Sequence, residues 1–107
     1  MNAEALAGVL GITLEKLASL LDIPSATFYR RKRTRRFSKQ ESDRLMRFLR
    51  LWWLACDVFE NEDGARTWLK APQFGLGGAI PLEYAATEVG AREVEDVLRR
   101  IDYGVVA

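Results

Sequence analysis

The chain of 107 residues is 49% hydrophobic and 29% charged, with 16 basic and 15 acidic residues. This composition indicates one small globular domain, or two half-sized units that share a core, and argues against wholesale disorder. The chain contains no histidine and a single cysteine, Cys56, which excludes an internal disulfide and argues against a histidine-dependent active site or a zinc site.

The net charge of +1 conceals a gradient along the chain. Residues 1–59 contain 11 basic and 6 acidic residues, a net charge of +5, whereas residues 60–107 contain 5 basic and 9 acidic residues, a net charge of −4. Such an asymmetry predicts two surfaces with different partners, and we place the two regions at residues 1–60 and 61–107. No stretch resembles a targeting signal or approaches the apolar length needed to span a membrane, so we expect a cytoplasmic protein.

The first half of the chain is predicted to be helical, because polar residues that cap helices recur just before apolar residues at helical spacing. Gly11 is expected to end the first helix in a left-handed conformation, and Asp22 must adopt that conformation in the turn over residues 22–24. Ser38 and Glu41 are spaced as a capping box. The expected helices, each with its N-cap, are Ala3–Leu10 (Asn2), Leu14–Leu21 (Thr13), Ala26 to about Arg33 (Ser25) and a long helix within Ser38–Glu60 (Ser38).

The apolar stripe of the long helix is wider than a surface helix needs. It comprises Leu45, Met46, Phe48, Leu49, Trp52, Trp53, Ala55, Cys56 and Phe59. This width predicts a central helix that is buried on two sides or that pairs with a second copy. The pattern leaves open whether the stripe is all core or partly a dimer seam.

The second half is predicted to contain shorter helices around a loop, with no strand. The segment APQFGLGGAIP, residues 71–81, holds three glycines and two prolines and is typical of a loop. Pro81 suits the first position of a helix, and Gly90 is expected to separate that helix from the last one. The expected elements are a break over Asn61–Gly64, helices over Ala65–Leu69, Pro81 to about Thr87 and Ala91–Ile101, and a short apolar tail.

The two helices on either side of Asp22 have the spacing of a helix-turn-helix, a motif that places its second helix in the DNA major groove. Ala18 is small enough for the helices to approach closely. From Ile23 to Gln40 there are seven basic residues and no acidic one, which suits phosphates and guanine edges. The residues predicted to contact DNA are Thr27, Tyr29, Arg30, Arg31, Arg33, Arg35 and Arg36.

These patterns allow other interpretations. A run of like charges is also typical of a solvated connector, and RNA is the alternative nucleic acid, although few aromatic residues are available for base stacking. The glycines of residues 74–81 lack the lysine and hydroxyl residue of a phosphate-binding loop. Carboxylate pairs such as Glu93 and Asp96 are predicted to be solubilising charges. We therefore expect no enzymatic activity, no cofactor and no metal.

Two stretches of sequence, residues 21–51 and 68–107, carry a combination of specific motifs. The first has paired arginines after an aromatic residue and a helix start at Ser38. The second has the signature Trp68-Leu69, Leu76-Gly77-Gly78, Pro81, Thr87, Gly90, Val94 and Ile101-Asp102-Tyr103-Gly104. Together they resemble the Xre/MbcA/ParS family of antitoxins over about Leu14 to Ala107.

The resemblance implies an all-α fold with an N-terminal helix-turn-helix-like unit, a long central helix and a small helical C-terminal toxin-binding domain. It further implies a type II toxin–antitoxin system whose toxin carries an RES domain and consumes NAD or uses it for ADP-ribosylation. The antitoxin is expected to cover the toxin's active-site cleft, to repress its own operon by binding operator DNA, and to form a homodimer.

Carried onto this chain, the resemblance places the toxin-contacting residues in the glycine loop and the tail: Gly77, Gly78, Pro81, Asp102, Tyr103, Gly104, Val105 and Val106. An acidic domain suits a cationic cleft that binds a pyrophosphate. Two departures from the family pattern, Asp22 in place of a turn glycine and Arg31 at an apolar position, weaken the prediction of specific DNA recognition. The alternative function is a stand-alone helix-turn-helix transcription repressor.

Overall fold

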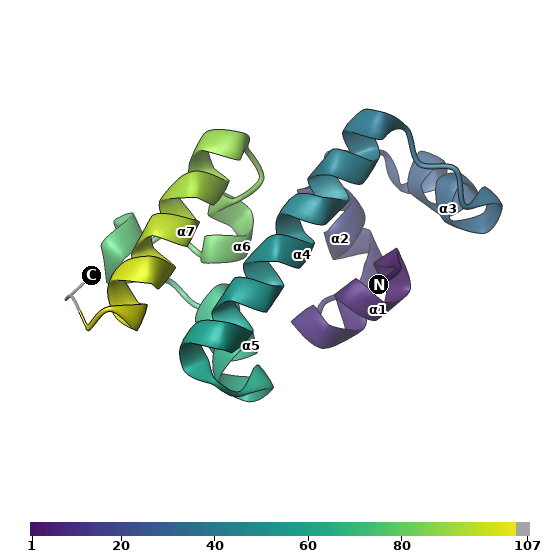
Figure 1. Cartoon of the computed structure of the whole chain (residues 1–107). Coiled ribbons are helices and arrows are strands. Elements are labelled where there is room, and N and C mark those ends of the chain that lie inside the picture. Colours follow the sequence, from purple (N-terminus) through teal and green to yellow (C-terminus); the bar gives the residue numbers. More distant parts are fainter. Residues whose placement is uncertain (105–107) are drawn as a thin grey trace.

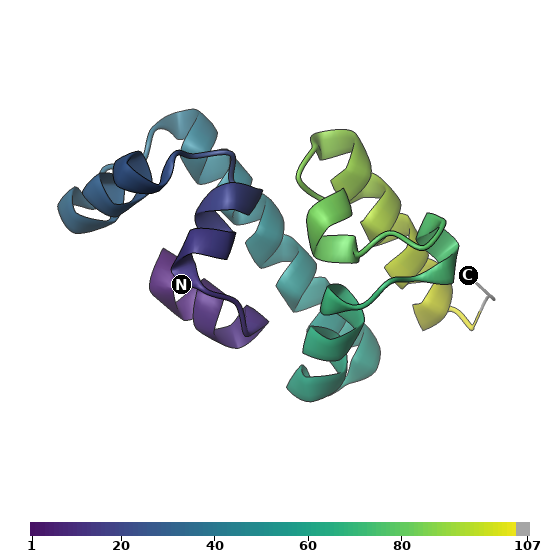
Figure 2. The ribbon, with the colours of Figure 1, turned by 180° about the vertical axis from the view of Figure 1, so that it is seen from behind.

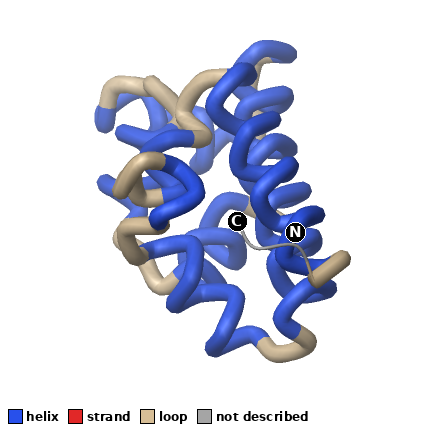
Figure 3. The backbone as a smooth tube through the Cα atoms, turned by 90° about the vertical axis from the view of Figure 1, so that its left-hand side faces the viewer, coloured by secondary structure: helices blue, strands red, loops and turns tan. Residues whose placement is uncertain are grey.

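The computed structural model describes residues 1–104, and that part of the chain consists of helices and loops without a strand (Figures 1 and 3). The helices are α1 (Ala3–Leu10), α2 (Leu14–Leu20), α3 (Ser25–Thr34), α4 (Lys39–Phe59), α5 (Glu62–Lys70), α6 (Pro81–Tyr84) and α7 (Glu88–Asp102), with a 3₁₀ turn, η1 (Phe74–Leu76), between α5 and α6. The predicted all-α fold class, with its N-terminal helix-turn-helix and separate C-terminal helical region, is confirmed.

The long helix α4 is the element around which the others pack. Helices α1 to α3 lie on one side of it and α6 and α7 on the other, while α5 folds back at its C-terminal end (Figures 1 and 2). Phe48, Leu51 and Ala55 of α4 are completely buried between these layers. Burial of large apolar side chains contributes about 1.5–3 kcal/mol each, so this shared core stabilises both halves of the molecule.

Side chains of α5 join the two halves at the end of α1. Nε of Arg66 donates a hydrogen bond to the carbonyl oxygen of Val9 at 2.6 Å, and Nζ of Lys70 donates to that of Gly11 at 2.6 Å. Carbonyl groups at a helix C-terminus lack partners within the helix and carry partial negative charge. These two cations satisfy them and hold α5 against α1.

Most of the predicted helix caps are confirmed. The side chain of Asn2 accepts a hydrogen bond from the backbone N–H of Ala5, and that of Thr13 accepts one from Lys16. Ser38 and Glu41 form the complete capping box at the start of α4. Gly11 ends α1 with a φ of 68°. Local polar residues therefore determine where α1, α2 and α4 begin.

The predicted cap at Ser25 is wrong. Ser25 is the first residue of α3, and Pro24 occupies the N-cap position without a capping side chain. The carbonyl oxygen of Pro24 accepts the N–H of Phe28 at 2.8 Å. Because the extended ψ of 141° at Pro24 keeps it outside the helix, the helix begins immediately after the proline, one residue earlier than predicted.

Two glycines that were predicted to interrupt helices lie inside them. The break after α4 falls at Glu60, which has a φ of 58°, and Asn61 caps α5 by accepting the N–H of Gly64 at 2.6 Å. Likewise, Thr87 caps α7, so Gly90 lies in the first turn of that helix, and α6 ends at Tyr84 rather than at Thr87. A Cβ atom on Gly90 would lie 1.8 Å from the carbonyl oxygen of Tyr84. Gly90 therefore permits a close backbone contact between α6 and α7, which its sequence position alone did not reveal.

Candidate functional site

Helices α2 and α3 form the predicted helix-turn-helix. Asp22 in the turn adopts a left-handed conformation with a φ of 55°, which aspartate tolerates better than most residues. Ala18 and Ile23 are buried at the crossing, and Phe28 of α3 is completely buried. The apolar residues on both helices therefore hold the crossing as the spacing predicted.

Three carboxylates from three different helices hold α3 in place. The hydroxyl of Tyr29 donates a hydrogen bond to Glu15 of α2 at 2.6 Å, and Nζ of Lys32 lies 3.1 Å from Glu4 of α1. The hydrogen bond lowers the pKa of Glu15 and raises the pKa of Tyr29. Because these contacts join different elements, they fix the orientation of α3 relative to the rest of the domain.

The third contact joins α3 to the start of α4. Nε of Arg31 lies 3.1 Å from Oε1 of Glu41, although Nε has no partner at hydrogen-bond geometry, so the contact is an ion pair rather than an aligned hydrogen bond. The same carboxylate accepts the backbone N–H of Ser38, which is the first cause of its lowered pKa, and Arg31 lowers the pKa further. Arg31, which stands where the family pattern has an apolar residue, therefore has a structural role in this chain.

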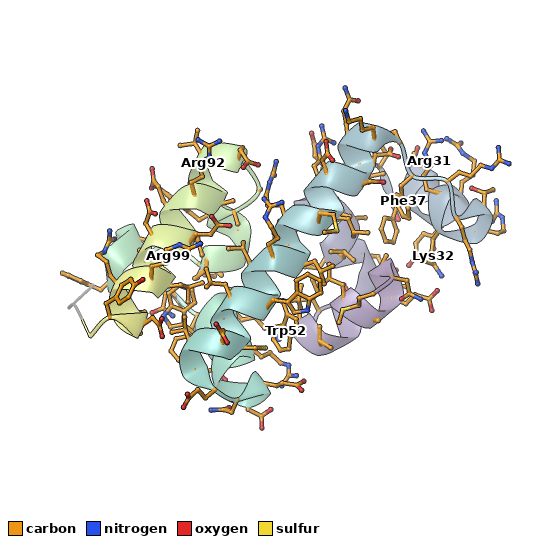
Figure 4. The ribbon with its side chains drawn as sticks, viewed as in Figure 1. Arg31, Lys32, Phe37, Trp52, Arg92 and Arg99 are labelled. Atoms are coloured by element: carbon orange, nitrogen blue, oxygen red, sulfur yellow. The ribbon has the colours of Figure 1, made fainter. Side chains whose placement is uncertain are left out.

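Four of the predicted DNA-contacting residues remain free on the surface. Within residues 1–104, no ion pair and no hydrogen bond engages the side chains of Arg30, Arg33, Arg35 or Arg36, and all four are exposed. We call these residues the arginine face. Thr27, Tyr29 and Arg31 are only half-exposed. Figure 4 places this end of the molecule far from Arg92 and Arg99 of α7.

The glycine loop of the second half is a closed turn with a fixed shape. Its N–H groups bond back across the loop, from Gly78 to the carbonyl of Gln73 at 2.9 Å and from Gln73 to that of Ala79 at 3.0 Å. Gly77 and Gly78 have φ values of 65° and 88°, which favour glycine, and both are exposed. The side chain of Pro81 is completely buried, so it positions the loop from within rather than facing a partner.

The described part of the tail continues from the end of α7. Asp102 is the last residue of that helix, Tyr103 is 80% exposed and Gly104 has a φ of 76°. The predicted contacts at Val105 and Val106 lie outside the described residues. The turn η1 packs against α7, so the glycine loop and the tail lie at the same end of the molecule (Figures 1 and 2).

Phe74 was missed as a candidate contact residue. Its side chain is 92% exposed in η1, directly before the glycine loop. Together with Tyr103 it places two exposed aromatic side chains on neighbouring elements, and we call this pair the aromatic end. Phe74, between Pro72 and Gly75, has no large apolar neighbour three or four positions away in the sequence, and that signal could have identified it.

The remaining features of the described residues concern metal ligands, membrane spans and the single cysteine. They contain no group of three side chains able to hold a metal ion, and none of their helices combines the length and apolar character of a membrane span. Cys56 is half-buried beside the core, and burial raises its thiol pKa, which disfavours a reactive thiolate.

Comparisons with known proteins match both halves of the chain. Residues 3–50 match the family described as the antitoxin Xre-like helix-turn-helix domain, and residues 54–104 match the antitoxin Xre/MbcA/ParS C-terminal toxin-binding domain. Among curated proteins, an antitoxin Xre of Yersinia enterocolitica is 41% identical over 85 residues, covering 78% of this chain and 57% of that protein.

Two further relatives carry the same name. The antitoxin Xre of Photorhabdus laumondii is 38% identical over 73 residues, covering 67% of this chain and 49% of the relative, and that of Pseudomonas putida is 32% identical over 83 residues, covering 77% and 52%. The chain spans about half the length of these curated relatives. With its helix-turn-helix matched in residues 3–50 and its toxin-binding domain in residues 54–104, the chain belongs to the Xre/MbcA/ParS family of antitoxins.

Proposed function

We propose that this chain is the antitoxin of a type II toxin–antitoxin system in the cytoplasm, and that it neutralises an RES-domain toxin that consumes NAD. The single observation that carries the proposal is the exposure of Phe74 (92%) and Tyr103 (80%) at the opposite end of the molecule from the arginine face. Two unpartnered aromatic side chains on a monomer are typical of a protein-binding surface. The chain itself performs no reaction and needs no cofactor.

The proposed inhibition is steric and electrostatic. The closed glycine loop presents Phe74 from a rigid turn, which lowers the entropic cost of binding. Asp102 and the net charge of −4 in residues 60–107 complement the cationic groups that a pyrophosphate-binding cleft requires. Gly77, Gly78, Tyr103 and Gly104 contact the rim of the cleft, and Pro81 supports the loop.

The proposed regulation uses the arginine face. Arg30, Arg33, Arg35 and Arg36 contact operator phosphates and base edges, while Thr27, Tyr29 and Arg31 contribute at its margin. Binding of the antitoxin, alone or with its toxin, then represses the operon. We further propose that residues 1–60 serve DNA binding, that residues 61–107 serve toxin binding, and that the protein acts as a homodimer.

Co-expression with the neighbouring RES-type reading frame tests the proposal. The full chain should restore growth and NAD levels and should co-purify with the toxin, whereas a variant lacking residues 102–107 should lose both effects and still bind operator DNA. If the full chain neither restores growth nor co-purifies, yet retains operator DNA, the protein is instead a stand-alone repressor.

A further inference from the structure

The exposed surface of α4 is confined to one narrow stripe. Beyond the first turn of the helix, its exposed residues are Asp43, Met46, Arg50, Trp53 and Asp57, and every other residue is buried or half-buried. These positions alternate at spacings of three and four residues, which is the period of a coiled-coil seam. We call this set the α4 seam.

The α4 seam carries apolar side chains that a solvent-facing stripe does not need. Trp53 is 52% exposed and Met46 is 44% exposed, although both stand on the most central helix of the molecule. Figures 1 and 2 show that α4 is uncovered on the side seen in Figure 1 and covered by other helices on the opposite side. Tryptophan is the side chain most enriched in the energetic centre of protein interfaces.

We propose that the α4 seam is the interface between two copies of this chain, with the two α4 helices antiparallel. This proposal rests on the self-association proposed above and names its surface. Charge decides the orientation. Residues 36–50 contain five basic and two acidic residues, whereas residues 51–65 contain four acidic residues and no basic one. An antiparallel pair places each basic segment against an acidic one and opposes the two helix dipoles, and a parallel pair does the reverse.

Two antiparallel registers bring four of the five seam positions opposite one another. In the register that sets an arginine against a tryptophan, Arg50 of one copy faces Trp53 of the other and Met46 faces Asp57, and Asp43 alone faces no seam residue. The guanidinium of Arg50 then lies over the indole ring of the second copy, a favourable cation–π arrangement, and reaches toward its Asp57. The two-fold axis repeats both contacts.

This arrangement also suits the rest of the molecule. In this register Lys39 of one copy lies opposite position 64 of the other, an offset of about 25 residues. At about 1.5 Å of rise per residue, the starts of the two α4 helices lie about 37 Å apart. This distance is close to the ~34–36 Å spacing of successive major grooves. Because α3 and α7 lie on opposite sides of α4 (Figure 1), a two-fold axis perpendicular to the paired helices keeps both arginine faces on one side. Both aromatic ends remain on the other side.

Sedimentation equilibrium of the full chain and its variants tests the proposal. The wild-type chain should dimerise, and Trp53→Ala should raise the dimer dissociation constant by at least about tenfold. The matched control is Val89→Ala, which removes an apolar side chain that is 69% exposed on α7 and should leave the constant unchanged. Since Trp53 and Val89 are both exposed, the thermal unfolding of dilute monomer should change little in either variant.

Charge exchange tests the orientation. Arg50→Glu should weaken the dimer, because it brings a glutamate near Asp57 of the second copy, and the double variant Arg50→Glu/Asp57→Arg should restore it. A parallel pair predicts no loss for the single variant, since two like charges face each other before and after the change.

Three results would overturn the proposal in distinguishable ways. If the wild-type chain stays monomeric at every concentration, both the proposed homodimer and the proposed α4 interface are rejected. The proposals on toxin binding and DNA binding are not affected by that result. A dimer that is insensitive to Trp53→Ala retains the homodimer and rejects the seam. Loss of toxin binding in Trp53→Ala with the dimer intact assigns the seam to the toxin instead.

Discussion

At Gly90 the first turn of α7 passes so close to the carbonyl oxygen of Tyr84 that no side chain fits between them. Gly8 is the opposite case, since a Cβ atom there would meet nothing within 4 Å. Both glycines lie inside helices, and their sequence neighbourhoods do not distinguish them. Only the position of α6 against α7 determines which glycine is required.

Gly90→Ala should therefore destabilise the protein by about 3 kcal/mol or more, because a backbone carbonyl, unlike a flexible side chain, cannot move aside. Gly8→Ala should instead stabilise it by about 0.5–1 kcal/mol through lower backbone entropy in the unfolded chain. Urea unfolding followed by circular dichroism measures both. Equal effects of the two substitutions would contradict the close contact at Tyr84.

Glu41 is the residue at which the start of α4 and the end of α3 are held together. Its pKa lies below the ordinary value of 4.5, first because the backbone N–H of Ser38 bonds to the carboxylate and then because Arg31 lies beside it. A carboxyl whose pKa is lower in the folded state stabilises the fold above its unfolded pKa. That contribution is lost as the pH falls through the folded value.

Glu41→Gln should flatten the acid side of the stability profile. The wild-type protein should exceed the variant by about 1 kcal/mol at neutral pH, and the difference should shrink below pH 4.5 as Glu41 becomes protonated. Thermal unfolding at a series of pH values measures this, with Asp96→Asn, an exposed change on α7, as the control. A difference that is constant with pH would show that Glu41 acts by hydrogen bonding alone.

At the scale of the elements, the basic residues of α3, together with Arg35 and Arg36 directly after it, are divided between structural contacts and the free surface. Arg31 and Lys32 hold α3 to α4 and α1, whereas the arginine face has no partner within residues 1–104. The sequence predicted one continuous basic block, because charge periodicity does not tell which cations meet carboxylates from distant helices. The division follows from tertiary contacts alone.

Arg33→Ala/Arg36→Ala should reduce the log–log salt slope of operator binding by about 2, since each arginine that leaves a phosphate removes roughly 0.9 from the slope. The free energy of unfolding should change by less than about 0.5 kcal/mol. Arg31→Ala should lower that free energy by about 0.5–1 kcal/mol instead. Fluorescence anisotropy across a salt series measures the effect on DNA binding, and urea unfolding measures the effect on stability. An unchanged salt slope would indicate that the arginine face is a solvated connector and not a DNA-binding surface.

The helix starts were largely predictable from the sequence because their signals are local. Asn2, Thr13 and Ser38 bond to N–H groups three residues onward, so residue type and spacing suffice. Helix ends at glycines were predictable only in part, because a glycine signals either a break or a close contact. Gly11 ends α1 as predicted, whereas Gly64 and Gly90 lie inside helices. The exposure of Phe74 and Trp53 depends on how α7 and α4 are covered, and a linear pattern does not contain that information.

For the whole molecule, the arginine face and the aromatic end lie at opposite ends of a structure with principal extents of 44 × 25 × 20 Å. Substitutions at one end should therefore act independently of those at the other, since distant sites without shared partners are additive. The two proposed activities should be separable by mutation.

Phe74→Ala/Tyr103→Ala should weaken toxin binding by at least about tenfold, because exposed aromatic residues become buried anchors at an interface. Operator binding should not change, and neither should the free energy of unfolding, since both side chains are exposed in the free protein. Calorimetric titration of the toxin and anisotropy with DNA give the two readouts. Phe74→Trp should retain toxin binding, and a parallel loss of both activities would point to misfolding rather than to a binding surface.

The matched family segments, residues 3–50 and 54–104, meet inside α4, and the helix runs without interruption from Lys39 to Phe59. The two matched segments are therefore not detachable modules. A fragment cut between them would carry half of a helix whose apolar side is exposed to water, so a single proteolytic cleavage there should abolish both proposed activities at once.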